Sequence, residues 1–235
     1  RVAVGARDLE SRSRRAAFGA LTEAALAGGG EVRADALDLT DPASVTAFCA
    51  RAADRFGPAD VLVNAAGVTA EQPVQGHSDA LWRQVIDTNL TGAFRMIRAC
   101  LPAMIARGWG RIVNIGSTAA TVGWKDNPAY CASKAGLLGL TRCVALEGAA
   151  HGVTCVMVSP TWVDTPMMEA DLAEVVAREG RGRSTTEARA EIAAQNPQGR
   201  IIEAGEVAAL IGFLIGDAAK GITMEEVKIT GGALW

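Results

Sequence analysis

The 235-residue chain has little of what marks membrane, secreted and metal-binding proteins. No apolar run approaches the roughly 18 residues needed to span a bilayer, and the start shows no signal-peptide pattern. The five cysteines are an odd number, lie far apart and include no C-x-x-C pair, so neither a disulfide framework nor a zinc site is expected. These absences favour a cytoplasmic protein with reduced cysteines and no bound metal.

The charge balance excludes a second group of functions. The sequence holds 23 basic and 26 acidic residues, a net charge of −3 at pH 7. Without an excess of positive charge, no binding to nucleic acid or to an anionic membrane is expected. Hydrophobic residues make up 49% of the chain, which supplies ample material for a core. Because this length fits one α/β domain, we predict a single domain over residues 1–235.

Side chains that exchange protons near neutral pH are also scarce. The chain has two histidines, His77 and His151, both in loop-like stretches, and a single tyrosine, Tyr130. The G-x-S-x-G turn that presents the nucleophile of many serine hydrolases is absent. A hydrolase is therefore disfavoured, and any chemistry that needs a phenol must use Tyr130.

What the sequence does have is a regular alternation of short apolar runs with longer amphipathic stretches. The runs are nearly all Val, Ile, Leu and Ala, which is typical of strands buried on both faces of a parallel sheet. Strands are predicted over residues 1–5, 31–39, 59–67, 110–117, 152–160 and 225–230. Helices are predicted over residues 9–26, 40–57, 79–107 with an interruption near Thr91–Gly92, 127–150, 167–180, 185–195 and 203–215. This order predicts an α/β fold, a Rossmann-type doubly wound parallel sheet in three layers, α/β/α.

Residues 163–202 depart from the alternation. The segment is polar and rich in arginine, and it follows a strand whose carboxyl end lies at the ligand-binding edge of such a sheet. We interpret it as a substrate lid within the domain, with a plain surface excursion as the alternative. Its Arg178, Arg181 and Arg183 either bind an anionic group or form a solvated face.

A serine, a tyrosine and a lysine form the candidate catalytic group. Tyr130 and Lys134 are four residues apart in a predicted helix, so they share one face. A free tyrosine, with a pKa of about 10, is a poor acid–base catalyst at neutral pH, and a cation one turn away stabilises its phenolate. Ser117 ends a predicted strand, where its hydroxyl is placed to hold a substrate oxygen. Taken alone, a Y-x-x-x-K pair is also common on exposed helices.

Further motifs occur in order around this group. They are ALDLTD at residues 36–41, NAAG at 64–67, DTNLTG at 87–92, SPTWVDTPM at 159–167 and ITGGAL at 229–234. Together with Ser117 and the Y-x-x-x-K pair, they resemble the short-chain dehydrogenase/reductase family over essentially the whole chain. The resemblance extends to its 3-oxoacyl reductases and ketoreductases.

The resemblance implies reversible hydride transfer between a nicotinamide and a carbonyl carbon. It implies that Tyr130 protonates the carbonyl oxygen, that Ser117 hydrogen-bonds it, and that Lys134 binds the nicotinamide ribose and lowers the tyrosine pKa. Asn89 completes the catalytic group by holding a water, with a plain helix kink as the alternative. Cofactor contacts are implied for Arg7, Asp38, Leu39, Asn64, Ala65, Ala66, Gly67, Tyr130, Lys134, Pro160, Thr161, Val163 and Thr165. Because Thr161 stands where the family usually has glycine, its backbone must adopt an ordinary conformation or the turn must shift.

The first residues bear on the cofactor. The stretch RVAVGARD matches the second strand of the family's sheet, so we expect the first strand and the glycine-rich phosphate-binding turn upstream of Arg1, with a divergent or inactive fold as the alternative. The glycines at 28–30 follow a helix and precede a strand, which is the wrong order for that turn. Arg7 at the strand end favours the 2′-phosphate of NADP. NAD(H) is the alternative if Asp8 turns inward.

The predicted substrate pocket is apolar and aromatic, which suits a ketone with aliphatic or aromatic substituents. Its predicted walls are Thr118, Trp124, Trp162, Met167 and Met168, for which packing of the lid on the core is the alternative. The sequence thus predicts an NADP(H)-dependent reductase of a ketone or 3-oxoacyl group. Two alternatives stay open, an NAD-dependent secondary alcohol or 3-hydroxyacid dehydrogenase of the same family and a non-catalytic nucleotide-binding member. The resemblance also implies a homotetramer or homodimer formed through the helices at 79–107 and 127–150.

Overall fold

The computed structural model describes residues 1–9, 12–180 and 182–233. Its strands are β1 (Val2–Ala6), β2 (Val32–Ala36), β3 (Val61–Asn64), β4 (Gly110–Ile115), β5 (Val153–Pro160), β6 (Val163–Asp164), β7 (Ile202–Glu203) and β8 (Glu226–Ile229). Its helices are α1 (Arg12–Ala27), α2 (Pro42–Phe56), α3 (Asp79–Ile86), α4 (Gly92–Arg107), α5 (Pro128–Ala149), α6 (Pro166–Glu179), α7 (Thr185–Gln195) and α8 (Ala204–Leu214). Every strand and helix predicted from the sequence is present, with small shifts at the ends.

The strands pair in parallel throughout. A four-stranded sheet has the order β3-β4-β5-β8, and β1 and β2 form a separate pair. Among the described residues, β1 pairs only with β2, and β3 pairs on one edge only, with β4. β5 is buried along its whole length, whereas Val2 in β1 and Val63 in β3 are 47% and 39% exposed. The interior of the molecule is therefore centred on β4 and β5.

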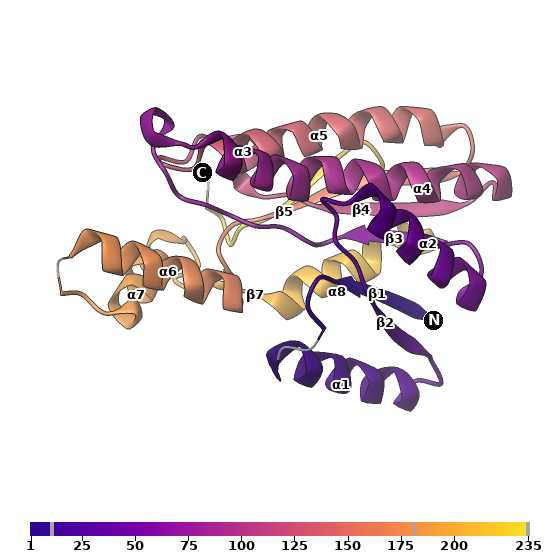
Figure 1. The fold of residues 1–235 in the computed structure, drawn as a ribbon, viewed down its shortest axis with the longest axis horizontal. Helices are drawn as coiled ribbons and strands as arrows, with labels where there is room; N and C mark the ends of the chain where they lie inside the picture. The colour runs from indigo at the N-terminus through magenta and orange to yellow at the C-terminus, as the bar shows by residue number, and fades with distance from the viewer. Residues whose placement is uncertain (10–11, 181, 234–235) are drawn as a thin grey trace.

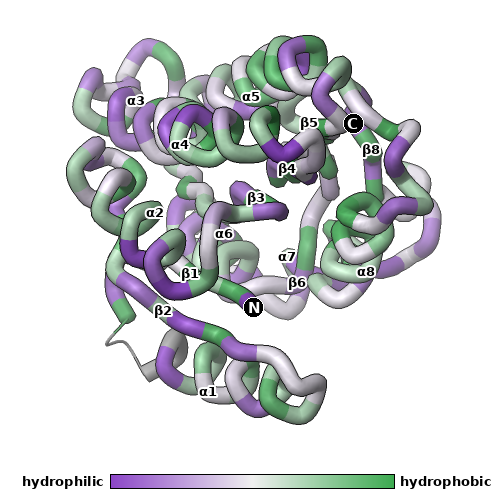
Figure 2. Tube along the Cα trace, turned by 90° about the vertical axis from the view of Figure 1, so that its right-hand side faces the viewer, coloured by the Kyte–Doolittle hydropathy of each residue, from purple (hydrophilic) through white to green (hydrophobic). Residues whose placement is uncertain are grey.

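Helices cover both faces of the strands, which confirms the three-layer prediction. Figure 1 shows α4 and α5 on one side and α1 and α8 on the other, and Figure 2 shows the same layers from a second direction. On the first side, Met104 of α4 packs with Ile112 and Cys155 of the sheet, all three fully buried. On the second side, Ile211 and Leu214 of α8 pack against β4, β5 and β8.

Local sequence signals set the helix ends. Asp41 caps α2 through its side chain, Pro42 occupies the first position, and Gly57 ends the helix with a φ of 83°. Gly28–Gly30 ends α1 directly before β2, as predicted. The expected interruption of the long helix is a π-helical turn over Asp87–Thr91, between α3 and α4. The kink thus lies just before the Thr91–Gly92 step that the sequence indicates.

Residues 163–202 form a small unit at one end of the molecule. In Figure 1, α6 and α7 project from the body, and β6 pairs with β7 where the segment leaves and rejoins it. The two helices share a small core of Met168, Leu172 and Ala188. Arg189 of α7 binds both Asp164 and Glu169, at 2.5 and 2.6 Å. The sequence predicted both helices, but strands of two residues are too short to show a period, so it missed the β6–β7 pair.

Candidate active site

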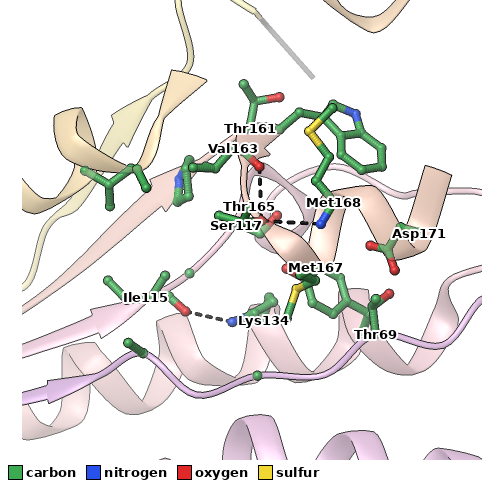
Figure 3. Close-up of a pocket in the computed structure, with 18 of the residues that line it drawn as sticks. Thr69, Ile115, Ser117, Lys134, Thr161, Val163, Thr165, Met167, Met168 and Asp171 are labelled. Atoms are coloured by element: carbon green, nitrogen blue, oxygen red, sulfur yellow. Dashed lines mark hydrogen bonds between the residues drawn. The ribbon is translucent and has the colours of Figure 1, made fainter. Parts of the chain in front are cut away.

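A cavity of about 470 Å³ opens where β3, β4 and β5 end, beneath α6 (Figure 3). Its wall comes from the loop after β3, the end of β4, the start of α5, the segment after β5, and α6 and α8. The site residues predicted from the sequence that lie on this wall are Ala65, Gly67, Ser117, Trp124, Tyr130, Lys134, Pro160, Thr161, Trp162, Val163, Thr165, Met167 and Met168. The fold thus gathers residues from distant parts of the sequence at one edge of the sheet.

Ser117, Tyr130 and Lys134 meet on the wall of this cavity. Ser117 follows β4, is buried, and accepts a hydrogen bond from the Ala119 N–H at 3.1 Å. Its hydroxyl also hydrogen-bonds the phenol of Tyr130. The Lys134 Nζ lies 5.5 Å from the centre of the Tyr130 ring and donates to the Ile115 carbonyl at 2.7 Å. A hydroxyl, a phenol and a cation therefore adjoin one another at the edge of an apolar space.

The protonation of Tyr130 differs from the prediction. Burial raises the pKa of Tyr130, the hydrogen bond from Ser117 lowers it in part, and the charge of Asp171 raises it further. The predicted lowering of this pKa by Lys134 is not found, because burial dominates and the ammonium is turned to the Ile115 carbonyl. Burial lowers the pKa of Lys134 to about 8. At neutral pH, Tyr130 therefore holds its proton and Lys134 is largely charged.

Asn89 lies behind the wall, not on it. Its Oδ1 accepts from the Val68 N–H at 2.8 Å, and its Nδ2 donates to the Val68 carbonyl at 2.9 Å and to the Ser133 hydroxyl at 3.1 Å. A Cβ placed on Gly67 would lie 3.5 Å from Asn89 Oδ1 and 3.7 Å from Lys134 Nζ. Asn89 thus fastens the loop after β3 directly over Lys134. Both hydrogens of the Asn89 amide are engaged, so Asn89 can hold a water only through Oδ1 or its main chain. The water-holding role stays a prediction.

The residues predicted to hold the far end of the cofactor lie outside the cavity. Arg7 follows β1 and is exposed, and Asp38 follows β2. Hydrogen bonds from the Thr40 hydroxyl and N–H, and then the charge of Arg7, lower the pKa of Asp38. Arg7 and Asp38 therefore face the same region, at the carboxyl ends of β1 and β2.

Three of the predicted cofactor residues do not present their side chains to the cavity. The Leu39 side chain is only 8% exposed and packs in the core, because the segment after β2 runs towards α4. The Asn64 side chain donates to Asn114 Oδ1 at 2.8 Å, so it joins β3 to β4. Ala66 is exposed beside the cavity without lining it. Any contact of Leu39 or Asn64 with a cofactor would thus use the main chain.

The nicotinamide end of a dinucleotide fits the residues on the wall. An ammonium has three donors, and within the described residues Lys134 gives one of them to a protein acceptor, the Ile115 carbonyl. Gly67 leaves space above that ammonium. Thr161 is not among the described residues with positive φ, so its backbone is ordinary, as the sequence required. A cation with donors to spare and an open glycine suit the hydroxyls of a ribose.

The substrate side of the cavity is aromatic and apolar. Trp124 and Trp162 meet edge to face, with ring centres 5.0 Å apart and an angle of 78°. Met167 is 43% exposed and lies on the wall, whereas Met168 also packs in the small core of α6 and α7. Thr118 is a correction: it is only 3% exposed and off the wall, because the chain turns inward there into a short 3-10 helix.

The sequence analysis missed two acidic side chains on the wall, Glu71 and Asp171. Asp171 follows Met167 by four residues and Met168 by three, so helical spacing places all three on one face of α6. That spacing was a usable signal. Glu71 lies in the loop after β3, where no period exists to reveal it.

The described residues show neither a metal centre nor a membrane span. No group of three or more His, Cys, Asp or Glu side chains in the described part of the chain is arranged to hold a metal ion. Within the same residues, no helix is both long and apolar enough to cross a bilayer.

Comparison with known proteins identifies the family. Residues 6–233 match the family model described as enoyl-(acyl carrier protein) reductase. The chain belongs to the short-chain dehydrogenase/reductase family. Nearly the whole chain is covered by the match, so the resemblance read from the motifs is confirmed.

Three proteins illustrate the range of this family near the chain. The 3-oxoacyl-[acyl-carrier-protein] reductase FabG of Salmonella typhimurium is 36% identical over 196 residues, 83% of this chain and 75% of that protein. The D-beta-hydroxybutyrate dehydrogenase of Rhizobium meliloti is 38% identical over 198 residues, again 83% and 75%. A variant of actinorhodin polyketide ketoreductase, solved with NADPH, superimposes with a TM-score of 0.88 at 35% identity over 98% of this chain and 85% of that one.

Proposed function

We propose that this short-chain dehydrogenase/reductase uses NADPH to reduce a ketone or 3-oxoacyl group to a secondary alcohol. The observation that carries the proposal is a protonated Tyr130, hydrogen-bonded to Ser117 and adjoining Lys134, on the wall of an apolar cavity. A neutral phenol is the form that gives a proton, which the reduction of a carbonyl group requires. The similarity to a 3-oxoacyl reductase and to a polyketide ketoreductase supports the same direction.

In the proposed mechanism, the bound nicotinamide supplies the hydride to the carbonyl carbon. The Tyr130 hydroxyl donates its proton to the carbonyl oxygen, so carbon and oxygen together gain the two hydrogens of the alcohol. Ser117 donates a hydrogen bond to that oxygen and holds it beside the phenol. The Lys134 ammonium then stabilises the phenolate left on Tyr130. The apolar walls exclude water from the reacting atoms.

Arg7 and Lys134 carry the proposed choice of cofactor. Lys134 holds the nicotinamide ribose through the donors that the Ile115 carbonyl leaves free. Arg7, exposed after β1, would pair with the 2′-phosphate of NADPH, and Asp38, which feels the charge of Arg7, would contact the adenine. NADH is the alternative cofactor.

A titration and a substrate panel test the proposal. NADPH and NADH are titrated by nucleotide fluorescence, and simple ketones are then compared with 3-oxoacyl thioesters. We expect tighter binding of NADPH, and turnover that Tyr130→Phe abolishes while nucleotide binding is kept. If neither NADPH nor NADH binds, the proposed reductase function is contradicted. The non-catalytic alternative would then hold only if a different nucleotide bound. Tighter binding of NADH would refute the role of Arg7.

Association and location form part of the same proposal. Phe94 of α4 and Leu146 of α5 are 42% and 66% exposed, on the two helices predicted to join subunits. We infer a homodimer or homotetramer in the cytoplasm. Sedimentation of wild type against Leu146→Glu tests the association, since a charge in a buried contact separates subunits.

A further inference from the structure

One charged group on the cavity wall has no part in the proposed reaction. Asp171 extends from α6, on the face that carries Met167 and Met168, and Figure 3 shows its carboxylate at the side of the cavity where Thr69 also lies. Among the described residues, no hydrogen bond or ion pair engages this carboxylate. The Trp124–Trp162 pair, Met167 and Met168 line the same cavity.

The groups around Asp171 leave this end of the cavity negative. Glu71, from the loop after β3, also lines the cavity, but Arg178 binds it at 2.5 Å. Glu174 lies one turn along α6, and Tyr130 faces Asp171 from α5 as a neutral phenol. Burial, and then the charges of Glu71 and Glu174, raise the pKa of Asp171 to about 6. At about pH 7.5, Asp171 is therefore an ionised carboxylate.

We propose that Asp171 determines substrate specificity: the substrate end that lies against α6 is uncharged and carries a hydrogen-bond donor such as a hydroxyl, and ketones with a carboxylate there are rejected. The inference rests on the proposed reductase function and deepens it. An ionised carboxylate only accepts hydrogen bonds, so a donor satisfies it. A second carboxylate in the same largely apolar cavity meets a repulsion that Arg178 does not offset, since Glu71 binds its guanidinium.

This assignment bears on the 3-hydroxyacid dehydrogenase that the sequence left open as an alternative to the reductase. A 3-hydroxyacid carries a carboxylate close to its reacting carbon, whereas a hydroxyketone or a 3-oxoacyl thioester is neutral near that carbon. The negative end of the cavity disfavours the acid and admits both neutral classes. Repulsion is an effective basis for such a choice because specificity depends on the difference in affinity between two ligands, and an unfavourable charge weakens the binding of only one of them.

The test compares ligands that differ mainly in charge. A series of oxo-acids of increasing chain length is measured against their methyl esters, with NADPH at about pH 7.5. The measurements compare wild type with Asp171→Asn and Glu174→Gln. Glu174→Gln is the control, because it also removes one negative charge from α6 but at a position that does not line the cavity. Binding is measured separately from turnover through tryptophan fluorescence, since Trp124 and Trp162 line the cavity. Melting temperatures establish that each variant folds.

We expect wild type to prefer ester over acid by roughly 30-fold in kcat/KM and in affinity. Asp171→Asn should narrow this ratio about 10-fold, and Glu174→Gln by less than about 2-fold, because an exposed charge is screened. In wild type, lowering the pH to about 5 should also narrow the binding ratio, as Asp171 takes up a proton.

Each remaining outcome is decisive. A ratio that Asp171→Asn leaves unchanged, or a wild type that prefers the acids, overturns the assignment of Asp171. Discrimination in binding without reduction of any ketone overturns the proposed function and leaves the assignment standing. If Asp171→Asn and Glu174→Gln narrow the ester-to-acid ratio equally, the discrimination comes from the net charge of α6 and not from a local contact with Asp171. This result also overturns the assignment of Asp171.

Discussion

Replacing Asn89 with alanine removes three hydrogen bonds that connect the π-helical turn to the loop after β3 and to α5. The bonds join the Asn89 amide to the Val68 N–H, the Val68 carbonyl and the Ser133 hydroxyl, at 2.8, 2.9 and 3.1 Å. Asn89 is only 2% exposed, so water does not readily replace its amide. Each bond contributes about 1 kcal/mol net, and unpaired buried partners cost more. We expect Asn89→Ala to lower the free energy of unfolding by about 2–4 kcal/mol.

Urea unfolding followed by tryptophan fluorescence measures this loss, and calorimetry should show a melting temperature lower by about 5–15 °C. Thr91→Ala is the matched control: it removes one partly buried bond, to Asp87 at 3.3 Å, from the same turn. It should cost less than about 1 kcal/mol. If Asn89→Ala unfolds within about 1 kcal/mol of wild type, the amide does not hold the loop. A loss of kcat with unchanged stability would instead favour the water-holding role.

Three further predictions concern proton transfer, thiol reactivity and packing. Because burial raises the pKa of Tyr130 and lowers that of Lys134 to about 8, ketone reduction should stay level from about pH 6 to pH 7 and fall above about pH 8, where Lys134 loses the charge that stabilises the phenolate; a reduction rate that rises between about pH 7 and pH 9 would contradict this. The hydrogen bond from Cys100 lowers the pKa of Cys49 to about 7, whereas burial raises the pKa of Cys155 to about 12. Iodoacetamide should therefore label Cys49 before Cys155, as measured by peptide mapping, and equal labelling of the two would refute this order. A Cβ on Gly116 would lie 2.6 Å from the nearest side-chain oxygen, so Gly116→Ala should cost about 1–3 kcal/mol in urea unfolding, and an unchanged midpoint would count against the tight packing.

The fold was predictable because its signals are local and repeated. Short runs rich in Val and Ile marked β4 and β5, and the Asp41, Pro42 and Gly57 signals placed both ends of α2. The pairing of β6 with β7 carries no such signal. It depends on residues 39 positions apart that meet only when α6 and α7 are folded.

The candidate site was predictable where one motif fixes both identity and placement. Tyr130 and Lys134 follow from helical spacing, and Ser117 from its place at a strand end. Leu39 and Asn64 show the limit, because a motif gives a residue's position in the chain and not the direction of its side chain. Leu39 turned into the core, and Asn64 turned to Asn114.

Transfer of deuterium from NADPH deuterated at both C4 positions tests the central claim most directly. The protein is incubated with a neutral ketone and the labelled cofactor, and the alcohol is analysed by mass spectrometry. The account predicts one deuterium on the carbinol carbon in wild type and no alcohol with Tyr130→Phe, since the carbon receives the hydride and Tyr130 supplies the oxygen's proton. Alcohol formed by Tyr130→Phe at the wild-type rate, or alcohol without deuterium, would contradict it.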